Sequence, residues 1–160
     1  MIKLVHRKHA EREKGKQTAE KLHELQVSLA GVAGAAGVAA GNIQGLVDSF
    51  KENKASLEKA RSKTLGSVDS SEYGVHFQSD QVIIFKGKVF SSSAVDNEII
   101  YVVNPISISN VTLDGVSGTS GDVYFNRLYG VPSSVGTITI SAPSAVKIIT
   151  ISITGTISVN

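Results

Sequence analysis

The four histidines are the side chains of this 160-residue sequence with the most versatile chemistry, because an imidazole can move a proton or bind a metal. His6, His9 and His23 lie in a charged N-terminal segment, whereas His76 alternates with apolar neighbours. The spacing of His6 and His9 could place two metal ligands on one helix face, but no carboxylate supports them at ligand spacing. The pattern favours a solvated helix face for these three histidines and an outward-facing strand position for His76.

Other sets of catalytic residues are absent from the sequence. Serine is abundant, but no serine stands in a nucleophile elbow or in a triad order. No glycine-rich stretch has a strand before it and a helix after it, as a phosphate-binding loop requires. The sequence has no Cys and no Trp, and only 6% of its residues are aromatic. We therefore expect no enzyme activity, no cofactor, no metal site and no small-molecule substrate.

The distribution of charge argues against a nucleic-acid partner. The net charge is +2, and the basic run between Lys3 and Arg12 is interrupted by Glu11. After Phe90 only Arg127 and Lys147 are basic, and no aromatic residues accompany the basic run. A solvated helix of mixed charge explains the N-terminal segment better.

An uncharged stretch, Leu25–Val47, is long enough to cross a bilayer but contains few large side chains. From Ala30 to Gly41 it consists only of Ala, Gly and Val. Leu, Ile and Phe each favour insertion by a few tenths of a kcal/mol at the centre of a bilayer, so insertion of this stretch would be marginal.

Helical periodicity surrounds this stretch. Glu11–Leu29 contains good helix formers, and Gly66 predicts the C-terminal end of the helix. From Asn42 to Leu65 the apolar residues recur every three or four positions and predict one face that packs on a sheet. The members of that face are Ile43, Leu46, Val47, Phe50, Leu57, Ala60, Thr64 and Leu65.

Glycines weaken the middle of the expected helix. Each interior glycine costs roughly 1 kcal/mol relative to alanine, so the glycine-rich part would be a poor helix in isolation. Gly37, Gly41 and Gly45 are spaced by four residues, a pattern that allows two helix backbones to pack closely. These three glycines are therefore predicted to be helix-packing positions.

The remainder of the sequence predicts an α+β fold, in which a long N-terminal helix packs on an antiparallel β-sheet or sandwich of six or more strands. Three parts are expected: a charged leader-like segment (1–24), a helix (25–65) that is Gly/Ala-rich to residue 45 and amphipathic beyond it, and a β domain (66–160). The expected strands are Tyr73–Phe77, Gln81–Phe90, Glu98–Val103, Ile106–Leu113, Asp122–Gly130, Thr137–Ile140 and Val146–Val159.

Five segments carry a family resemblance. "EKARSKTLGS", "SSEYGVHF", "VIIFKGKVF", "VYFNRLYGVPSSVGTITI" and "ITISITGTISV" occur in this order between Leu57 and Asn160. They resemble the minor pseudopilin H of type II secretion systems and the related minor type IV pilins. The resemblance implies a pilin-like fold and a structural role in a pseudopilus or pilus at the bacterial inner membrane, in the periplasm or on the cell surface. It also implies that other pilin-like subunits are partners through the N-terminal helix.

The resemblance extends to the N-terminal helix when "NIQGLVDSF" is aligned with the family. Glu24 then falls on a buried glutamate that neutralises the N-terminal amine of a neighbouring subunit, and Ala19–Glu20 falls on the leader-processing site. Glu20, Lys21 and His23 replace apolar residues of the family motif, so this motif is not intact. For Glu24, the alternative is an ordinary solvated charge.

Two explanations of the missing large side chains are open. The helix is either a natural, divergent one that packs only inside a filament, or an altered one that makes the protein soluble. The consistent loss of large residues favours alteration. Two other functions on the same fold are a DNA-binding minor pilin, although the tail "ITGTISVN" has no basic residue, and a surface adhesin module.

The glycine pattern generates a prediction about hydrogen exchange in the purified monomer. Amides before about Asn42 should exchange quickly, and those from Phe50 onward should exchange slowly, because burial of a side chain as large as Phe or Leu contributes roughly 1.5–3 kcal/mol. Uniform strong protection from Glu20 to Leu65 in a verified monomer would contradict this division.

Overall fold

The computed structural model describes the backbone of residues 2–68 and 70–159. Within helix α1, the side chains at positions 2–19, 27, 29, 32, 33, 35, 36 and 39 lie outside the description. The chain consists of two compact units, Met1–Ala40 and Gly41–Asn160. Helix α1 comprises Ile2–Leu65, so its residues 41–65 belong to the second unit. In the described part of the chain, no helix combines the length and apolar character that spanning a membrane requires.

Helix α1 ends where the sequence predicts. The N–H of Gly66 donates to the carbonyl of Ser62 at 2.9 Å, and the N–H of Ser67 donates to the carbonyl of Thr64 at 3.4 Å. These bonds satisfy carbonyls that the last helical turn leaves without intrahelical partners. Lys63 lies in this turn, where a positive charge is favourable.

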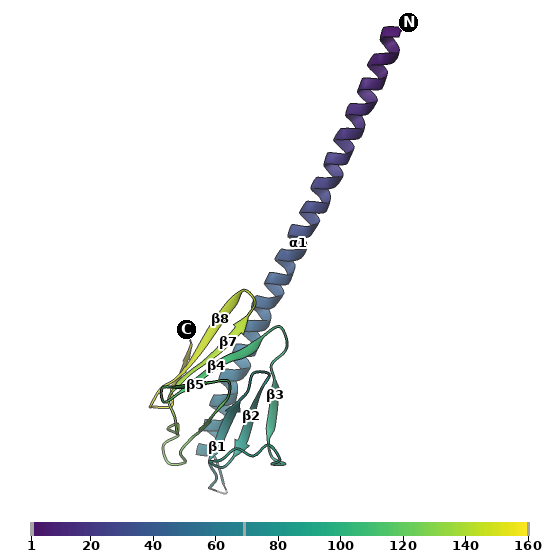
Figure 1. The fold of residues 1–160 in the computed structure, drawn as a ribbon. Helices are drawn as coiled ribbons and strands as arrows, with labels where there is room; N and C mark the ends of the chain where they lie inside the picture. The colour runs from purple at the N-terminus through teal and green to yellow at the C-terminus, as the bar shows by residue number, and fades with distance from the viewer. Residues whose placement is uncertain (1, 69, 160) are drawn as a thin grey trace. The chain divides into compact units, whose positions relative to one another are not determined.

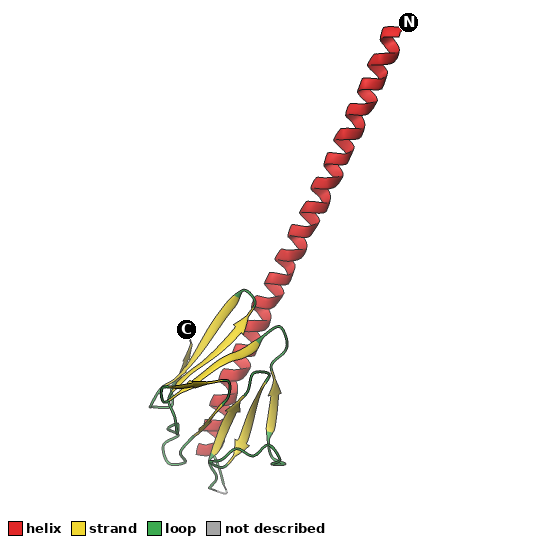
Figure 2. Cartoon of the chain, viewed as in Figure 1, coloured by secondary structure: helices red, strands yellow, loops and turns green. Residues whose placement is uncertain are grey.

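The described residues of the second unit form two antiparallel sheets (Figures 1 and 2). The four-stranded sheet has the order β3-β2-β1-β6, with β1 at Tyr73–Phe77, β2 at Gln81–Lys86, β3 at Glu98–Tyr101 and β6 at Gly121–Tyr124. The five-stranded sheet has the order β5-β4-β7-β8-β9, with β4 at Ser107–Leu113, β5 at Val116–Gly118, β7 at Gly136–Ala142, β8 at Ala145–Ile151 and β9 at Ile157–Val159. The unit is therefore α+β, with a helix that packs on antiparallel sheets.

The core of the second unit joins one face of α1 to both sheets. Leu46, Phe50, Leu57, Ala60 and Thr64 are buried, as the apolar periodicity predicts. The four apolar residues of this set belong to the same cluster as inward-facing residues of both sheets, Val75, Phe77, Val82, Ile84, Ile108, Val111, Val123, Ile138, Ile140, Ile149 and Ile151. One hydrophobic core therefore holds the helix and the two sheets together.

Two residues of the predicted apolar face are instead half exposed. Ile43 is 50% exposed and Leu65 is 51% exposed. They lie before and after the buried positions Leu46–Thr64, at the two ends of the helical contact. The periodicity of a helix indicates which face is buried but not how far along the helix the sheets reach.

Three buried polar residues complete this face of α1 and were not predicted. Ser49, Asn53 and Ser56 are less than a tenth exposed. Asn53 Nδ2 donates to the Ser49 carbonyl at 2.6 Å, and Ser56 Oγ donates to the Glu52 carbonyl at 2.8 Å. Bonds to the preceding helical turn allow short polar side chains to be buried among apolar ones.

Several predicted strands are shorter in the structure. The single strand expected at Val146–Val159 is wrong: β8 and β9 form a hairpin, with a turn in which the Ser152 N–H donates to the Thr156 carbonyl at 3.0 Å. Gly155 has a φ of 76° there, a value that glycine adopts without steric cost. Residues with and without a side-chain hydroxyl alternate through this turn as they do in a strand, so the period of two residues gave no signal for it.

Three other predicted strands end early. Gln81–Phe90 ends at Lys86, Glu98–Val103 ends at Tyr101, and Asp122–Gly130 ends at Tyr124. Asp114–Gly115 forms the turn between β4 and β5.

The packing of the core in the second unit predicts how much a cavity lowers the free energy of unfolding. Leu57 is completely buried, so Leu57→Ala should lower the free energy of unfolding by about 2–5 kcal/mol. Leu65→Ala is the matched control on the same helix, and because Leu65 is 51% exposed it should cost about 0.5 kcal/mol or less. Denaturant unfolding of both variants measures the difference, and equal costs would contradict the described packing of α1.

Candidate functional site

The residues predicted for assembly lie in an exposed part of α1. Every side chain that the structure describes between Glu20 and Gly41 is exposed, including Glu24. Leu22 is 58% exposed and Leu25 is 68% exposed. With 3.6 residues per helical turn, Glu20 and Glu24 share one face, and Leu22 and Leu25 lie on the other side of the helix. A neighbouring molecule that contacts Glu20 and Glu24 would therefore lie on a different side of the helix from one that contacts Leu22 and Leu25.

The predicted processing point, Ala19–Glu20, lies inside α1. The side chain of Ala19 lies outside the described residues, and Glu20 is exposed. His6 and His9 also lie in the part of α1 whose side chains are not described, whereas His23 is exposed. In the described residues, no group of three or more His, Asp or Glu side chains is placed to hold a metal.

The three helix-packing glycines have different surroundings. A Cβ on Gly37 or Gly41 would meet no atom within 4 Å, and the same holds for Gly31 and Gly34. A Cβ on Gly45 would lie only 2.8 Å from Ile106 Cδ1. Gly45 therefore lies against the Ile106 side chain within the chain, whereas Gly37 and Gly41 leave an open surface on the helix.

Glu98 joins α1 to β3 through two lysines. Lys59 Nζ lies 2.5 Å from Glu98 Oε2, and Lys63 pairs with Glu98 Oε1. The hydrogen bonds from Lys59 and Lys63 stabilise the carboxylate, so they hold the pKa of Glu98 below its ordinary value of 4.5, although partial burial opposes them. This bridge ties the last turns of α1 to the first residue of β3.

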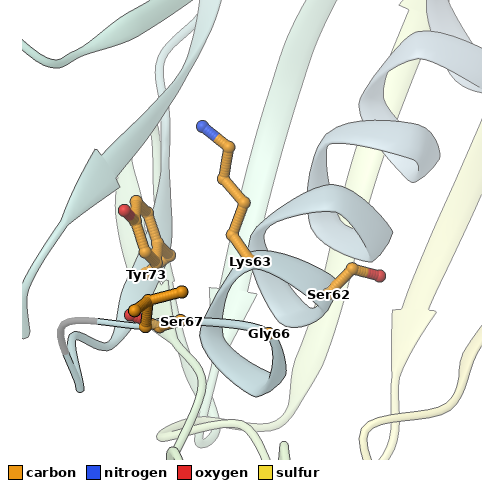
Figure 3. A pocket seen from close by; sticks show the side chains of 6 residues that line it. Ser62, Lys63, Gly66, Ser67 and Tyr73 are labelled. Atoms are coloured by element: carbon orange, nitrogen blue, oxygen red, sulfur yellow. The ribbon is translucent and has the colours of Figure 1, made fainter.

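A depression of about 790 Å³ lies beside the C-terminal end of α1. Figure 3 shows the Lys63 side chain beside the Tyr73 ring, while the Ser62 hydroxyl points away from them. Lys63 Nζ lies 5.2 Å from the centre of that ring, a cation–π distance, and also pairs with Glu98. The lysine is thus engaged in structural contacts.

His76 is less exposed than the sequence suggests. Its side chain is 12% exposed, its Nδ1 pairs with Asp122 of β6, and its ring stacks on Phe90 with centroids 3.9 Å apart. The Phe90 ring also lies edge-to-face with the Phe85 ring, with the two centroids 5.7 Å apart. The segment after β2 therefore covers the outer face of the four-stranded sheet at His76 and Phe85.

Arg61 connects α1 to a loop that follows β6. Its Nε donates to the carbonyl of Gly130 at 2.9 Å, and Gly155 lies against the same carbonyl. A Cβ at Gly155 would lie 2.6 Å from the Gly130 oxygen, so these backbones can approach only because residue 155 is a glycine. The arginine fixes both loops at the end of the helix.

No family model, curated protein or solved structure matches the chain. The resemblance to minor pseudopilins therefore rests on the five sequence segments from Leu57 onward.

Sequence reasoning did not find the contacts of Glu98, Asp122 and Arg61. Each joins residues more than 30 positions apart. Local spacing carries no signal for such pairs, because only the tertiary fold brings them together.

The Glu98 bridge predicts a pH-dependent contribution to stability. A carboxylate whose pKa is lowered by folding stabilises the protein above its unfolded pKa and loses this effect as the pH falls through the folded value. Glu98→Gln should therefore lower the free energy of unfolding at pH 7 by on the order of 1 kcal/mol or less, since the side chain is 35% exposed.

The difference between wild type and this variant should shrink as the pH falls below about 4. Glu58→Gln is the control, because Glu58 makes an exposed pair with Lys54 on one helix. Urea unfolding at several pH values measures both variants. A difference for Glu98→Gln that does not change with pH would contradict the ionic bridge.

Proposed function

We propose that this chain is a structural, non-catalytic subunit of a pilus-like filament, of the minor pseudopilin or minor type IV pilin kind. The observation that carries the proposal is that one part of α1 is buried in the core of the second unit and another part is exposed. The buried positions of the helix begin at Leu46, whereas every described side chain from Glu20 to Gly41 is exposed. A long helix with an exposed, mostly uncharged surface is suited to bury that surface against other subunits.

The glycines support a helix bundle as the mode of assembly. Without intermolecular contacts, Gly31, Gly34, Gly37 and Gly41 each cost roughly 1 kcal/mol relative to alanine. The space around them allows a neighbouring backbone to approach closely, which is how small residues promote helix association. A head-to-tail contact of this type, repeated without closure, produces an open helical filament.

The β domain supports the family assignment within the proposal. In chain order, the five resembling segments include the end of α1, β1, most of β2, parts of β6 and β7, and the end of β8 together with β9. All five segments contribute residues to one core around the helix, such as Ala60, Val75, Ile84, Phe125 and Ile151. In this proposal the unit Gly41–Asn160 is a pilin-like domain, and the filament lies at the cell envelope.

Adjacent substitutions in α1 test the proposal in cells that naturally produce the protein. Gly41→Leu should reduce incorporation into sheared filaments by about tenfold, the effect of roughly 1.4 kcal/mol in association free energy. Gly37→Leu should act in the same way. Ala40→Leu is the matched control for Gly41→Leu, because one residue turns the helix by more than a quarter of a turn.

None of these variants should lower the thermal stability of the monomer, because a Cβ at Gly37 or Gly41 meets no atom within 4 Å. Normal incorporation of both glycine variants would show that this face is not buried in a filament. Absence of the wild-type protein from envelope filaments would overturn the proposed function itself.

A further inference from the structure

Strand β3 is the outermost strand of the four-stranded sheet and bonds to β2 on one side only (Figure 2). The Val102 N–H donates to the Asp80 carbonyl at 2.7 Å, which continues the β2–β3 register. Bonded and non-bonded positions alternate along an antiparallel pair. The even-numbered residues of β3 therefore point their backbone groups toward β2, and Ile99 and Tyr101 point theirs to the open side.

Apolar side chains accompany this open backbone. Ile99, Tyr101 and Val103, at alternate positions, are 47%, 66% and 71% exposed. The opposite edge of the same sheet is partly closed, because the Ser133 N–H donates to the Tyr124 carbonyl of β6 at 2.7 Å. An edge strand without such cover is a template for another strand.

A groove of about 340 Å³ lies between β3 and α1. Ile84 and Ile100 contribute apolar surface to it, and Glu52, Lys59 and Glu98 contribute charge. Lys59 pairs with Glu98 at 2.5 Å, and Lys63 pairs with the same carboxylate, so Glu98 is fully compensated. The carboxylate of Glu52 has no ion-pair partner among the described residues, so it is the acidic group of the groove that is available to a basic residue.

We propose that this edge and groove bind an extended peptide segment of another protein, with apolar side chains at alternate positions and a basic residue that faces Glu52. Backbone bonds to Ile99 and Tyr101 would add a strand to the sheet, and the groove would select the side chains that point toward α1. This activity is separate from filament assembly, because it uses the open edge of β3 and not the exposed glycines of α1.

Peptide titrations test the proposal on the full chain by NMR. The probe is the blocked peptide acetyl-TVTVTKT-amide, and the comparison peptide has glutamate in place of lysine. Amide shifts should centre on Ile99 and Tyr101, and the lysine peptide should bind about fivefold more tightly, the size of an exposed charge pair. N-methylation of alternate peptide nitrogens on the bonding edge should abolish binding, because it removes the backbone donors without changing the protein.

Charge reversal in the groove provides the matched pair of variants. Glu52→Lys should reverse the preference, so that the glutamate peptide binds more tightly. Glu58→Lys makes the same charge change at an exposed position on a different face of α1 and should leave the preference for lysine. Equal affinity for both peptides, or shifts centred away from β3, would overturn the proposal.

Protection of the Ile99 and Tyr101 amides at high protein concentration without peptide would assign the edge to a second copy of the chain, and would also overturn the proposal.

Discussion

The burial of one stripe of α1 against two sheets is the constraint on which the second unit depends. Leu57 and Ala60 are completely buried, and Leu46 is nearly so. Each sheet has an apolar inner face that cannot remain in water, and the helix covers both faces at once. The alanine at position 60 has no large side chain, which allows the strands to approach the helix closely. Without the helical stripe, both inner faces would lose part of their cover.

Polar contacts fix the rotation and position of the helix within this core. Thr64 Oγ1 donates to the Ala60 carbonyl at 3.0 Å and accepts from the Tyr73 N–H at 2.8 Å, so it joins the last turn of α1 to β1. Arg61 bonds to the loop after β6, and Lys59 and Lys63 hold β3 through Glu98. Apolar burial is not directional, whereas these bonds require particular distances and angles.

The two proposed interaction surfaces follow different physical rules. An exposed helix whose glycines have open space around them suits close packing of helix backbones, in which van der Waals contact dominates. The open edge of β3 offers backbone donors and acceptors that β2 does not bond, and the Glu52 carboxylate beside them has no ion-pair partner among the described residues. One surface therefore selects partners by shape, and the other selects them by strand pairing and charge. Because the residues do not overlap, substitutions can separate the two activities.

Local sequence patterns predict the helical stripe, the end of α1 at Gly66 and the positions of most strands. These features depend on local periods of 3.6 and 2 residues and on turn residues, which can be read along the chain. The division of Val146–Val159 into two strands was missed because residues with and without a side-chain hydroxyl alternate through the turn, as they do in a strand. The burial of Ser49, Asn53 and Ser56 was missed because bonds to the preceding helical turn, rather than apolar character, make it favourable.

Which individual side chains are packed, paired or exposed depends on the tertiary structure. Gly37, Gly41 and Gly45 have the same spacing in the sequence, yet only Gly45 packs against another element, Ile106. The ion pairs of Glu98 and the open edge of β3 likewise depend on strand order. Strand order is set by burial summed over the whole core and by the lengths of the connecting loops. Local patterns establish which elements form, but contacts between distant residues decide which surfaces remain exposed.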